Sequence, residues 1–155
     1  MDKEKLKIGI LGCGRVCDHY VKKILIPERV GKLYEVVACC DVDENKSKLV
    51  AESFSCKAFN DINEFVKYKD MEVVVILTKS GQHYEHAKVC LSNHLNVIVE
   101  KPLTLRIEHA EELIEISSKT GRFCASIFQN RLNPAVEITK NAFENKRFGK
   151  LVSVS

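Results

Sequence analysis

The sequence predicts an α/β fold built on a doubly wound, mostly parallel β-sheet. Short apolar runs of strand length alternate along the chain with segments of helical periodicity. One of these runs, MEVVVILT at residues 71–78, is almost continuously apolar, which is typical of a central parallel strand covered on both faces. Because the connections are short and largely helical, right-handed crossovers should join the strands into one sheet.

The length and composition are those of one globular domain. The chain has 155 residues, of which 45% are hydrophobic and 29% are charged. No apolar run approaches the roughly 20 residues that a membrane-spanning helix needs, and the amino terminus, MDKEK, shows no secretory signal. We therefore expect a cytoplasmic protein with no membrane partner.

The distribution of charges argues against nucleic-acid binding, and the spacing of the cysteines argues against a metal site. The 24 basic and 21 acidic residues give a net charge of +3 without a basic block, so no nucleic-acid partner is expected. The seven cysteines include no Cys-x-x-Cys pair and no zinc-like histidine spacing, so no metal site is expected. They should be reduced thiols.

Three strands and two helices are predicted in the amino-terminal half. LKIGIL at 6–11 reads as a buried strand, and the helical pattern of 15–26 stops at the proline that follows. YEVVACCD at 34–41 has the β-branched residues of a second strand, and KAF at 57–59 is a short third one. Between them, 43–54 predicts a helix capped by its first aspartate.

The middle of the chain repeats the alternation of strand and helix. Asp61 can cap a short helix ahead of the central strand at 71–78, and a helix over 82–93 follows that strand. The next strand, at 95–100, must end before Pro102, because proline disfavours continuation of a strand and restrains the residue ahead of it.

The carboxy-terminal part predicts a helix over 105–119, a sixth strand over 123–129 and a last helix. Gly121 is typical of a left-handed cap at a helix end. Pro134 suits the first turn of the last helix, where its missing N–H costs nothing, and that helix should stop before Gly149.

A turn with two glycines separates the first strand from the first helix. The order strand, Gly12-x-Gly14, helix is the context in which such glycines predict dinucleotide binding in a Rossmann fold. The first glycine permits a tight turn, the second lets the backbone approach a pyrophosphate, and the N–H groups of Arg15 and Val16 then point toward the anion. Cys17 occupies the third, small position. The alternative is a tight strand-to-helix turn of any α/β protein.

Asp41 ends the second strand and is the candidate partner of the cofactor ribose. A carboxylate there accepts hydrogen bonds from the ribose hydroxyls and repels the 2′-phosphate of NADP, so NAD is the expected cofactor. Asp41 lies 27 residues after Gly14, beyond the usual spacing of about 20. The alternative role of Asp41 is a strand-end turn or cap, and Asp43 is a weaker ribose candidate.

Cys13 lies inside the glycine turn, beside a predicted helix N-terminus. Such an environment can lower the pKa of a thiol and make it reactive. We expect Cys13 to be tolerated there as a small residue rather than to have a redox role.

Three further stretches carry a resemblance. TKSGQHYEHA at 78–87, VIVEKPL at 97–103 and QNRLNPAV at 129–136 follow GILGCGRV in an order that resembles the Gfo/Idh/MocA oxidoreductases, the glucose–fructose oxidoreductase and inositol dehydrogenase family. The resemblance covers essentially the whole chain. The last stretch is similar to nucleotide-sugar 3-dehydrogenases that oxidise UDP-N-acetylglucosaminuronate. The resemblance implies an NAD-dependent hydride transfer to or from a secondary hydroxyl of a sugar or nucleotide-sugar.

The resemblance makes Glu100, Lys101 and Pro102 the family's Glu-Lys-Pro signature. It implies that Glu100 and Lys101 contact the cofactor and that Lys101, the predicted catalytic residue, also faces the substrate hydroxyl. The carboxyl end of a parallel strand is independently where ligands of such sheets bind. An ammonium there can orient the oxygen and help to move its proton. The family's proline often follows a cis bond, so a cis bond is expected before Pro102.

The loop TKSGQH resembles a family loop that borders the cofactor, which implies contacts from Thr78, Ser80 and His83. Lys79 stands where the family usually has proline. For His83 the alternative is a helix-start histidine bonded locally, and His86 is expected on a helix face.

Gln129 is an expected cofactor contact and Arg131 a weaker candidate at the nicotinamide end, against the alternatives of strand-end capping and a surface cation. The other histidines are expected to be structural or exposed, namely His19, His94 and His109.

The resemblance also predicts how this chain relates to a larger protein. In the family a second, α+β substrate domain supplies an Asp/His pair that supports proton removal, and no such pair follows residue 131. The final residues, KLVSVS, alternate like the beginning of a strand. We therefore expect a Rossmann domain over 1–148 and the start of a substrate domain at 149–155; a closing edge strand is the alternative.

The chain as given should bind NAD without turning over, and the full-length protein should be a homo-oligomeric enzyme. A non-catalytic NAD(P)-binding sensor of the same fold is the alternative function. The lysine of an intact Glu-Lys-Pro favours catalysis.

Overall fold

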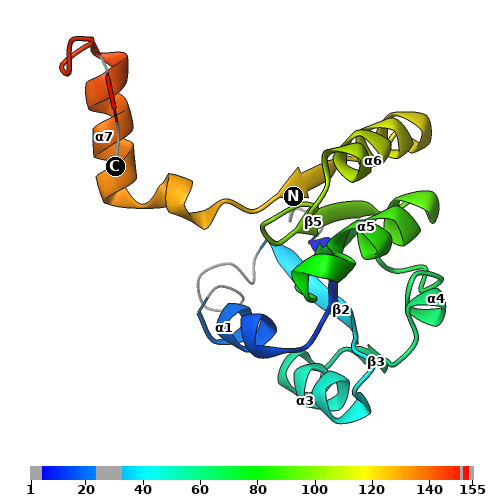
Figure 1. Cartoon of the computed structure of the whole chain (residues 1–155). Coiled ribbons are helices and arrows are strands. Elements are labelled where there is room, and N and C mark those ends of the chain that lie inside the picture. The colour runs from blue at the N-terminus through cyan, green and yellow to red at the C-terminus, as the bar shows by residue number, and fades with distance from the viewer. Residues whose placement is uncertain (1–4, 24–32, 151, 154–155) are drawn as a thin grey trace.

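The computed structural model of the chain describes residues 5–23, 33–150 and 152–153. It contains a six-stranded sheet in the order β3-β2-β1-β4-β5-β6, in which every pairing is parallel (Figure 1). This is the predicted doubly wound fold, with the strand order reversing between β1 and β4. The strands are β1 (Leu6–Leu11), β2 (Tyr34–Cys40), β3 (Lys57–Phe59), β4 (Val73–Ile76), β5 (Asn96–Val99) and β6 (Cys124–Ser126).

Helices connect the strands, and most begin or end where side-chain chemistry predicts. The described helices are α1 (Arg15–Lys23), α3 (Glu44–Phe54), α4 (Ile62–Phe65), α5 (His83–Ser92), α6 (Ile107–Thr120) and α7 (Pro134–Glu144), with 3-10 turns η1 (Ser80–Gln82) and η2 (Gln129–Leu132). Asp43 accepts a hydrogen bond from Asn45 N, and Asp61 accepts from the first turn of α4. Gly121 ends α6 at φ 66°. These predicted caps are confirmed.

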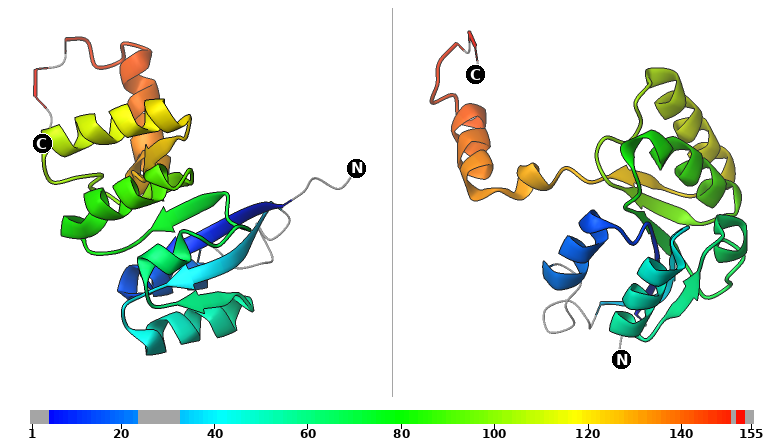
Figure 2. Two further views of the ribbon diagram at one scale, coloured as in Figure 1. Left: turned by 90° about the vertical axis from the view of Figure 1, so that its right-hand side faces the viewer. Right: turned by 60° about the horizontal axis from the view of Figure 1, so that its bottom comes forward.

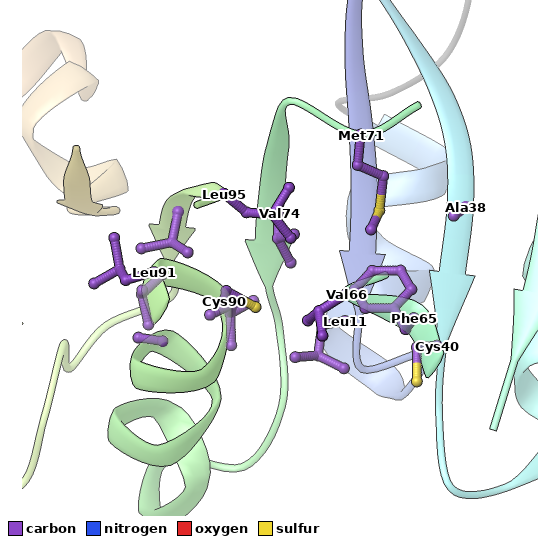
Figure 3. Close-up of a cluster of buried hydrophobic side chains, with 14 of the residues drawn as sticks. Leu11, Ala38, Cys40, Phe65, Val66, Met71, Val74, Cys90, Leu91 and Leu95 are labelled. Carbon is purple, nitrogen blue, oxygen red and sulfur yellow. The ribbon is translucent and has the colours of Figure 1, made fainter. Parts of the chain in front are cut away.

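The sheet buries one apolar cluster on each face. Helices α4, α5 and α6 cover one face, where Leu11, Phe65 and Leu91 are among the buried residues (Figure 3). Helices α1 and α3 cover the other, with Cys17 and Val50 buried against the strands. Figure 2 shows these two helical layers from further directions. All residues of β4 are buried between these two layers, which explains why the sequence of this strand is almost continuously apolar.

The strands predicted at 34–41 and 95–100 exceed β2 and β5 by one and two residues, and two others exceed the observed strands by four residues each. The strand expected over 71–78 is confined to β4, because Met71 turns into the core beneath β1: a Cβ on Gly9 would lie 2.3 Å from its Sδ atom. The strand expected over 123–129 is β6 alone, since η2 already begins at Gln129.

Two predicted elements lie partly at residues that the structure does not describe: the end of the first helix and the final strand. The predicted end of the first helix near Pro27 lies outside the described residues. Lys150, Val152 and Ser153, the described residues of the stretch KLVSVS, have no strand conformation.

Helix α7 differs from the others in its surroundings. It extends away from the sheet (Figures 1 and 2), and none of its residues is buried. Pro134 occupies its first turn and Asn133 accepts a hydrogen bond from Ala135 N, so its start is well capped. Among the helices of the described ranges, none has the length and hydropathy to cross a bilayer.

Candidate functional site

A pocket of about 540 Å³ opens at the carboxyl ends of β1, β2 and β4. This is the point where the strand order reverses, and open α/β sheets bind ligands there. Six of the predicted site residues line it, namely Gly12, Gly14, Arg15, Val16, Asp41 and Thr78. The structure therefore brings the glycine turn, the end of β2 and the loop after β4 to one cavity.

At Gly12 both the backbone conformation and the neighbouring protein atoms exclude a side chain. Its φ is +98°, a left-handed conformation that L side chains rarely adopt. A Cβ there would lie 2.8 Å from the backbone of Leu77 and of Thr78. Its N–H donates to Cys40 O at 2.8 Å, which fixes the turn against β2.

At Gly14 neither the backbone conformation nor the neighbouring protein atoms exclude a side chain. A Cβ there would meet nothing within 4 Å, and its φ lies outside the left-handed region. Gly14 O accepts a hydrogen bond from Asp18 N, so Gly14 is the residue immediately before α1 and offers no side chain to cap it. The first N–H groups of α1, including those of Arg15 and Val16, have no acceptor within the helix. These donors and the open space over Gly14 fit the diphosphate of a dinucleotide.

The carboxylate of Asp41 joins the glycine turn to the start of α3. Its Oδ2 atom accepts from Cys13 N at 2.7 Å and its Oδ1 atom from Asp43 N at 2.9 Å. Asp41 thus has the turn role that we gave as the alternative. Each carboxylate oxygen keeps further acceptor capacity on the pocket side, so this role is compatible with a ribose contact. Asp43 caps α3 and pairs with Lys46 at 3.1 Å.

His86 lies at the pocket, where its sequence position alone indicated only a helix face. Its Nδ1 atom is 2.9 Å from Thr78 Oγ1, and both residues line the cavity. Burial is the main cause that lowers the pKa of His86, with a further contribution from the nearby His83. No local sequence signal indicated this position, because its partner Thr78 lies eight residues earlier across the turn between β4 and α5.

His83 is buried, with 1% of its surface exposed. Its Nδ1 atom lies 2.7 Å from Pro102 O and its Nε2 atom 3.0 Å from Thr78 O. Both ring nitrogens therefore face backbone carbonyl oxygens, as in the locally bonded alternative. His83 is not among the described residues that line the pocket.

The Glu-Lys-Pro stretch follows β5 beside this loop. The peptide bond between Lys101 and Pro102 is cis, as predicted. Glu100 Oε2 accepts from Lys101 N at 2.8 Å, and Glu100 Oε1 accepts from the hydroxyl of Tyr20 at 2.8 Å. Tyr20, on α1, was not predicted as a site residue. The side chain of Lys101 is exposed at the carboxyl edge of the sheet.

Residues 6–128 match the profile of the Gfo/Idh/MocA group, described as an oxidoreductase family with an NAD-binding Rossmann fold. The chain belongs to the Gfo/Idh/MocA oxidoreductase family. This match confirms the predicted family and its NAD-binding domain.

Known Gfo/Idh/MocA proteins match over nearly all of the chain. Inositol 2-dehydrogenase of Salmonella typhimurium is 26% identical over 152 residues, 96% of this chain and 44% of that protein. Trans-1,2-dihydrobenzene-1,2-diol dehydrogenase of Xenopus tropicalis is 27% identical over 144 residues, 92% of this chain and 43% of that protein. The chain thus spans less than half the length of these curated relatives.

A solved structure shows the same arrangement. The WlbA dehydrogenase of Chromobacterium violaceum, in complex with NADH and UDP-GlcNAcA, superposes with a TM-score of 0.88 at 25% identity. The superposition covers 96% of this chain and 42% of that one.

The remaining predicted residues of this Gfo/Idh/MocA domain lie outside the described pocket lining. Ser80 begins η1, and Gln129 and Arg131 lie in η2; all three are exposed. The nicotinamide-end contacts of Ser80 and Gln129 therefore stay predictions. His19 and His94 are exposed, and His109 stacks on Tyr84 with ring centroids 3.8 Å apart.

The reactive environment considered for Cys13 is not what the fold provides. Cys13 is buried, and contacts with the thiols of Cys17 and Cys39, together with burial, raise its pKa above the ordinary value. Burial of the Cys13 thiol in the core outweighs any lowering of its pKa by the N-terminus of α1. Within residues 5–23, 33–150 and 152–153, no group of three or more His, Cys, Asp or Glu side chains is arranged to hold a metal ion.

Proposed function

We propose that this chain is the cofactor domain of an NAD-dependent dehydrogenase that transfers hydride between nicotinamide and a secondary hydroxyl of a sugar or nucleotide-sugar. One observation carries the cofactor half of the proposal: the first residues of α1, Arg15 and Val16, line the same pocket as the carboxylate residue Asp41. A diphosphate and a ribose diol need this pair of opposite functions.

The proposed cofactor contacts follow from the chemistry of each group. Arg15 and Val16 would donate backbone N–H groups to the diphosphate, and Arg15 adds a cation at the pocket rim. Asp41 would accept from the ribose hydroxyls. Thr78 would contact the cofactor from the loop after β4. When bound, NAD supplies the hydride acceptor that no amino-acid side chain provides.

We propose that Lys101 orients the substrate hydroxyl and stabilises its oxygen as the proton leaves. Its backbone N–H donates to Glu100 Oε2, while its side chain remains exposed at the sheet edge. Glu100 would border the nicotinamide end, together with Ser80, His83 and Gln129. For His83 the contacts with Pro102 and Thr78 favour a supporting role.

The substrate class is supported by relatives. Inositol 2-dehydrogenase is named for a polyol, and the WlbA dehydrogenase was solved with UDP-GlcNAcA. We further propose that residues 1–148 form the cofactor domain and that 149–155 begin a substrate domain, in keeping with the 44% of inositol 2-dehydrogenase that the chain covers. A homo-oligomeric full-length protein, a cytoplasmic location and the lack of a nucleic-acid partner stay predictions.

Calorimetric titration of this chain with NADH and NADPH tests the cofactor proposal. NADH should bind more tightly, and Asp41→Ser should reduce that preference because the carboxylate that repels a 2′-phosphate is gone. Glu44→Gln is the matched control, since it removes a nearby exposed carboxylate of α3 that is not among the described residues lining the pocket. Tighter binding of NADPH by the unmodified chain would contradict the proposal.

Catalysis is tested in the full-length protein. Lys101→Ala should abolish hydride transfer while leaving NAD affinity largely intact, whereas a non-catalytic NAD sensor would have no turnover to lose. Unchanged turnover would reject the catalytic role of Lys101.

A further inference from the structure

The side chain of Thr78 is held from two sides. Its Cγ2 methyl lies 2.8 Å from the position that a Cβ on Gly12 would occupy, so it packs against the glycine turn. Its Oγ1 atom lies 2.9 Å from His86 Nδ1. A threonine side chain has one stiff torsion, χ1, so these two contacts together fix where the hydroxyl points.

His86 is a wall of the cofactor pocket as well as the partner of Thr78. It lies in α5, and it lines the cavity with Thr78 and Gly12. A histidine that merely covered a helix face would have no polar contact with a residue of the pocket. Here Nδ1 of the imidazole lies within hydrogen-bond distance of the Thr78 hydroxyl, so its tautomer decides which of the two atoms donates.

We propose that His86 is a positioning residue for NAD: its neutral imidazole accepts the Thr78 hydroxyl proton at Nδ1, leaving the oxygen lone pairs of Thr78 to accept a hydrogen bond from a donor group of the cofactor. This inference rests on the proposed function of the pocket. Donor groups of this kind on the dinucleotide are the ribose hydroxyls and the amino and amide N–H groups. His86 itself need not touch the cofactor.

The surroundings favour the neutral imidazole. Partial burial disfavours the charged ring, and His83 lies nearby on the same helix, whereas Glu85 acts in the opposite direction. The pocket contains charges of both signs. The charged groups that share it with His86 are Arg15, Lys46 and Lys79 against Asp41, Asp43 and Asp61.

A set of substitutions in this chain separates the two contacts of Thr78. Thr78→Val keeps the Cγ2 methyl and replaces the hydroxyl with a second methyl, whereas Thr78→Ser keeps the hydroxyl and removes the methyl. His86→Leu removes the acceptor, while His86→Asn keeps a polar atom near the place of Nδ1. His94→Asn is the control, because His94 is exposed at φ +60°, a conformation that asparagine tolerates.

NADH binding, followed by the fluorescence of the reduced nicotinamide, gives the readout. Thr78→Val and His86→Leu should each weaken binding about three- to tenfold, the range of one neutral hydrogen bond. The double variant should be no weaker than either single one, because both changes remove the same interaction. His86→Asn should recover part of the affinity, and His94→Asn should bind like the unmodified chain. Additive losses, or full affinity in His86→Leu, would overturn the proposal.

A second measurement needs no cofactor. In the ¹⁵N NMR spectrum of the chain near pH 7.5, Nδ1 of His86 should be the unprotonated nitrogen, and Thr78→Val should shift its resonance while leaving that of His94 in place. A protonated Nδ1, or no response to Thr78→Val, would overturn the pairing even where NADH binds. Loss of NADH binding by the unmodified chain would instead overturn the proposed function.

Discussion

The Nδ1 atom of His83 lies 2.7 Å from the carbonyl oxygen of Pro102, a contact that joins the loop after β4 to the loop after β5. The other ring nitrogen faces Thr78 O at 3.0 Å. A single buried imidazole thus bridges the residue that we assign to the cofactor pocket and the proline that follows Lys101. The relative position of the two loops depends on this bridge.

Replacing His83 should therefore destabilise the domain. His83→Leu removes a buried imidazole whose neutral ring can donate its one N–H to only one of these carbonyl oxygens, so the free energy of unfolding should fall by about 1–3 kcal/mol. Urea denaturation followed by circular dichroism measures it. His94→Asn, at an exposed position, should change the free energy by less than about 0.5 kcal/mol. Equal stability of the two variants would show that the bridge contributes nothing.

The two glycines of the turn should respond differently to the same substitution. Gly12→Ala should lower the free energy of unfolding by about 1–3 kcal/mol, because its φ of +98° and the close backbone of Leu77 exclude a side chain. Gly14→Ala should fold normally, since its Cβ would meet no protein atom. It should nevertheless weaken NADH binding by about tenfold or more, because the methyl group occupies the approach to the diphosphate.

Gly81 provides the matched control for Gly14. A Cβ there also meets nothing within 4 Å, and Gly81 is not among the described residues that line the pocket. Gly81→Ala should bind NADH like the unmodified chain. If Gly14→Ala bound NADH normally, the proposal that the diphosphate lies against the glycine turn would be wrong.

Local chemistry explains why much of the fold and part of the site could be predicted. The cap at Asp43 depends on residues a few positions away, and apolar runs of strand length predicted the order of the elements. Gly12 was predicted from the local strand-Gly-x-Gly-helix pattern, although the atoms that exclude a side chain there belong to Leu77 and Thr78. Tyr20 and Glu100 are 80 positions apart, so only the tertiary fold brings them together. The role of His86 was missed for the same reason, because its partner lies across a turn whose path the sequence pattern does not define.

The hydrogen bond between Tyr20 and Glu100 should matter for turnover in the full-length protein. Tyr20→Phe keeps the ring, which is buried against the sheet, but removes the donor that holds Glu100 Oε1. Glu100 Oε2 then holds the backbone of Lys101 less firmly, so kcat should fall about three- to tenfold while the KM for NAD changes little.

Tyr34→Phe is the matched control for that experiment. The hydroxyl of Tyr34 is buried and has no hydrogen-bond partner among the described residues, so its removal breaks no such contact. Steady-state kinetics of both variants with the same substrate make the comparison. Equal kcat values in the two variants would mean that Tyr20 does not act through Glu100 on Lys101.

The lowered pKa of His86 predicts a dependence of stability on pH. Burial lowers the pKa in the folded chain below the ordinary value of 6.5, which we take for the unfolded chain. Between the two pKa values the unfolded chain binds more protons, so acidification favours unfolding. The contribution of His86 is complete above about pH 6.5 and is lost as the pH falls through the folded-state pKa, with a slope of at most about 1.4 kcal/mol per pH unit.

Carboxylates also titrate as the pH falls, so the comparison between variants isolates His86. The free energy of unfolding, measured in urea from pH 7.5 to 4.5, should fall more steeply in the unmodified chain than in His86→Asn, because the variant has no imidazole to protonate. His94→Asn is the control at an exposed histidine and should keep the steep dependence, since it leaves His86 in place. Parallel curves for the unmodified chain and His86→Asn would mean that the pocket does not favour the neutral ring, which is the state in which Nδ1 can accept the proton of Thr78.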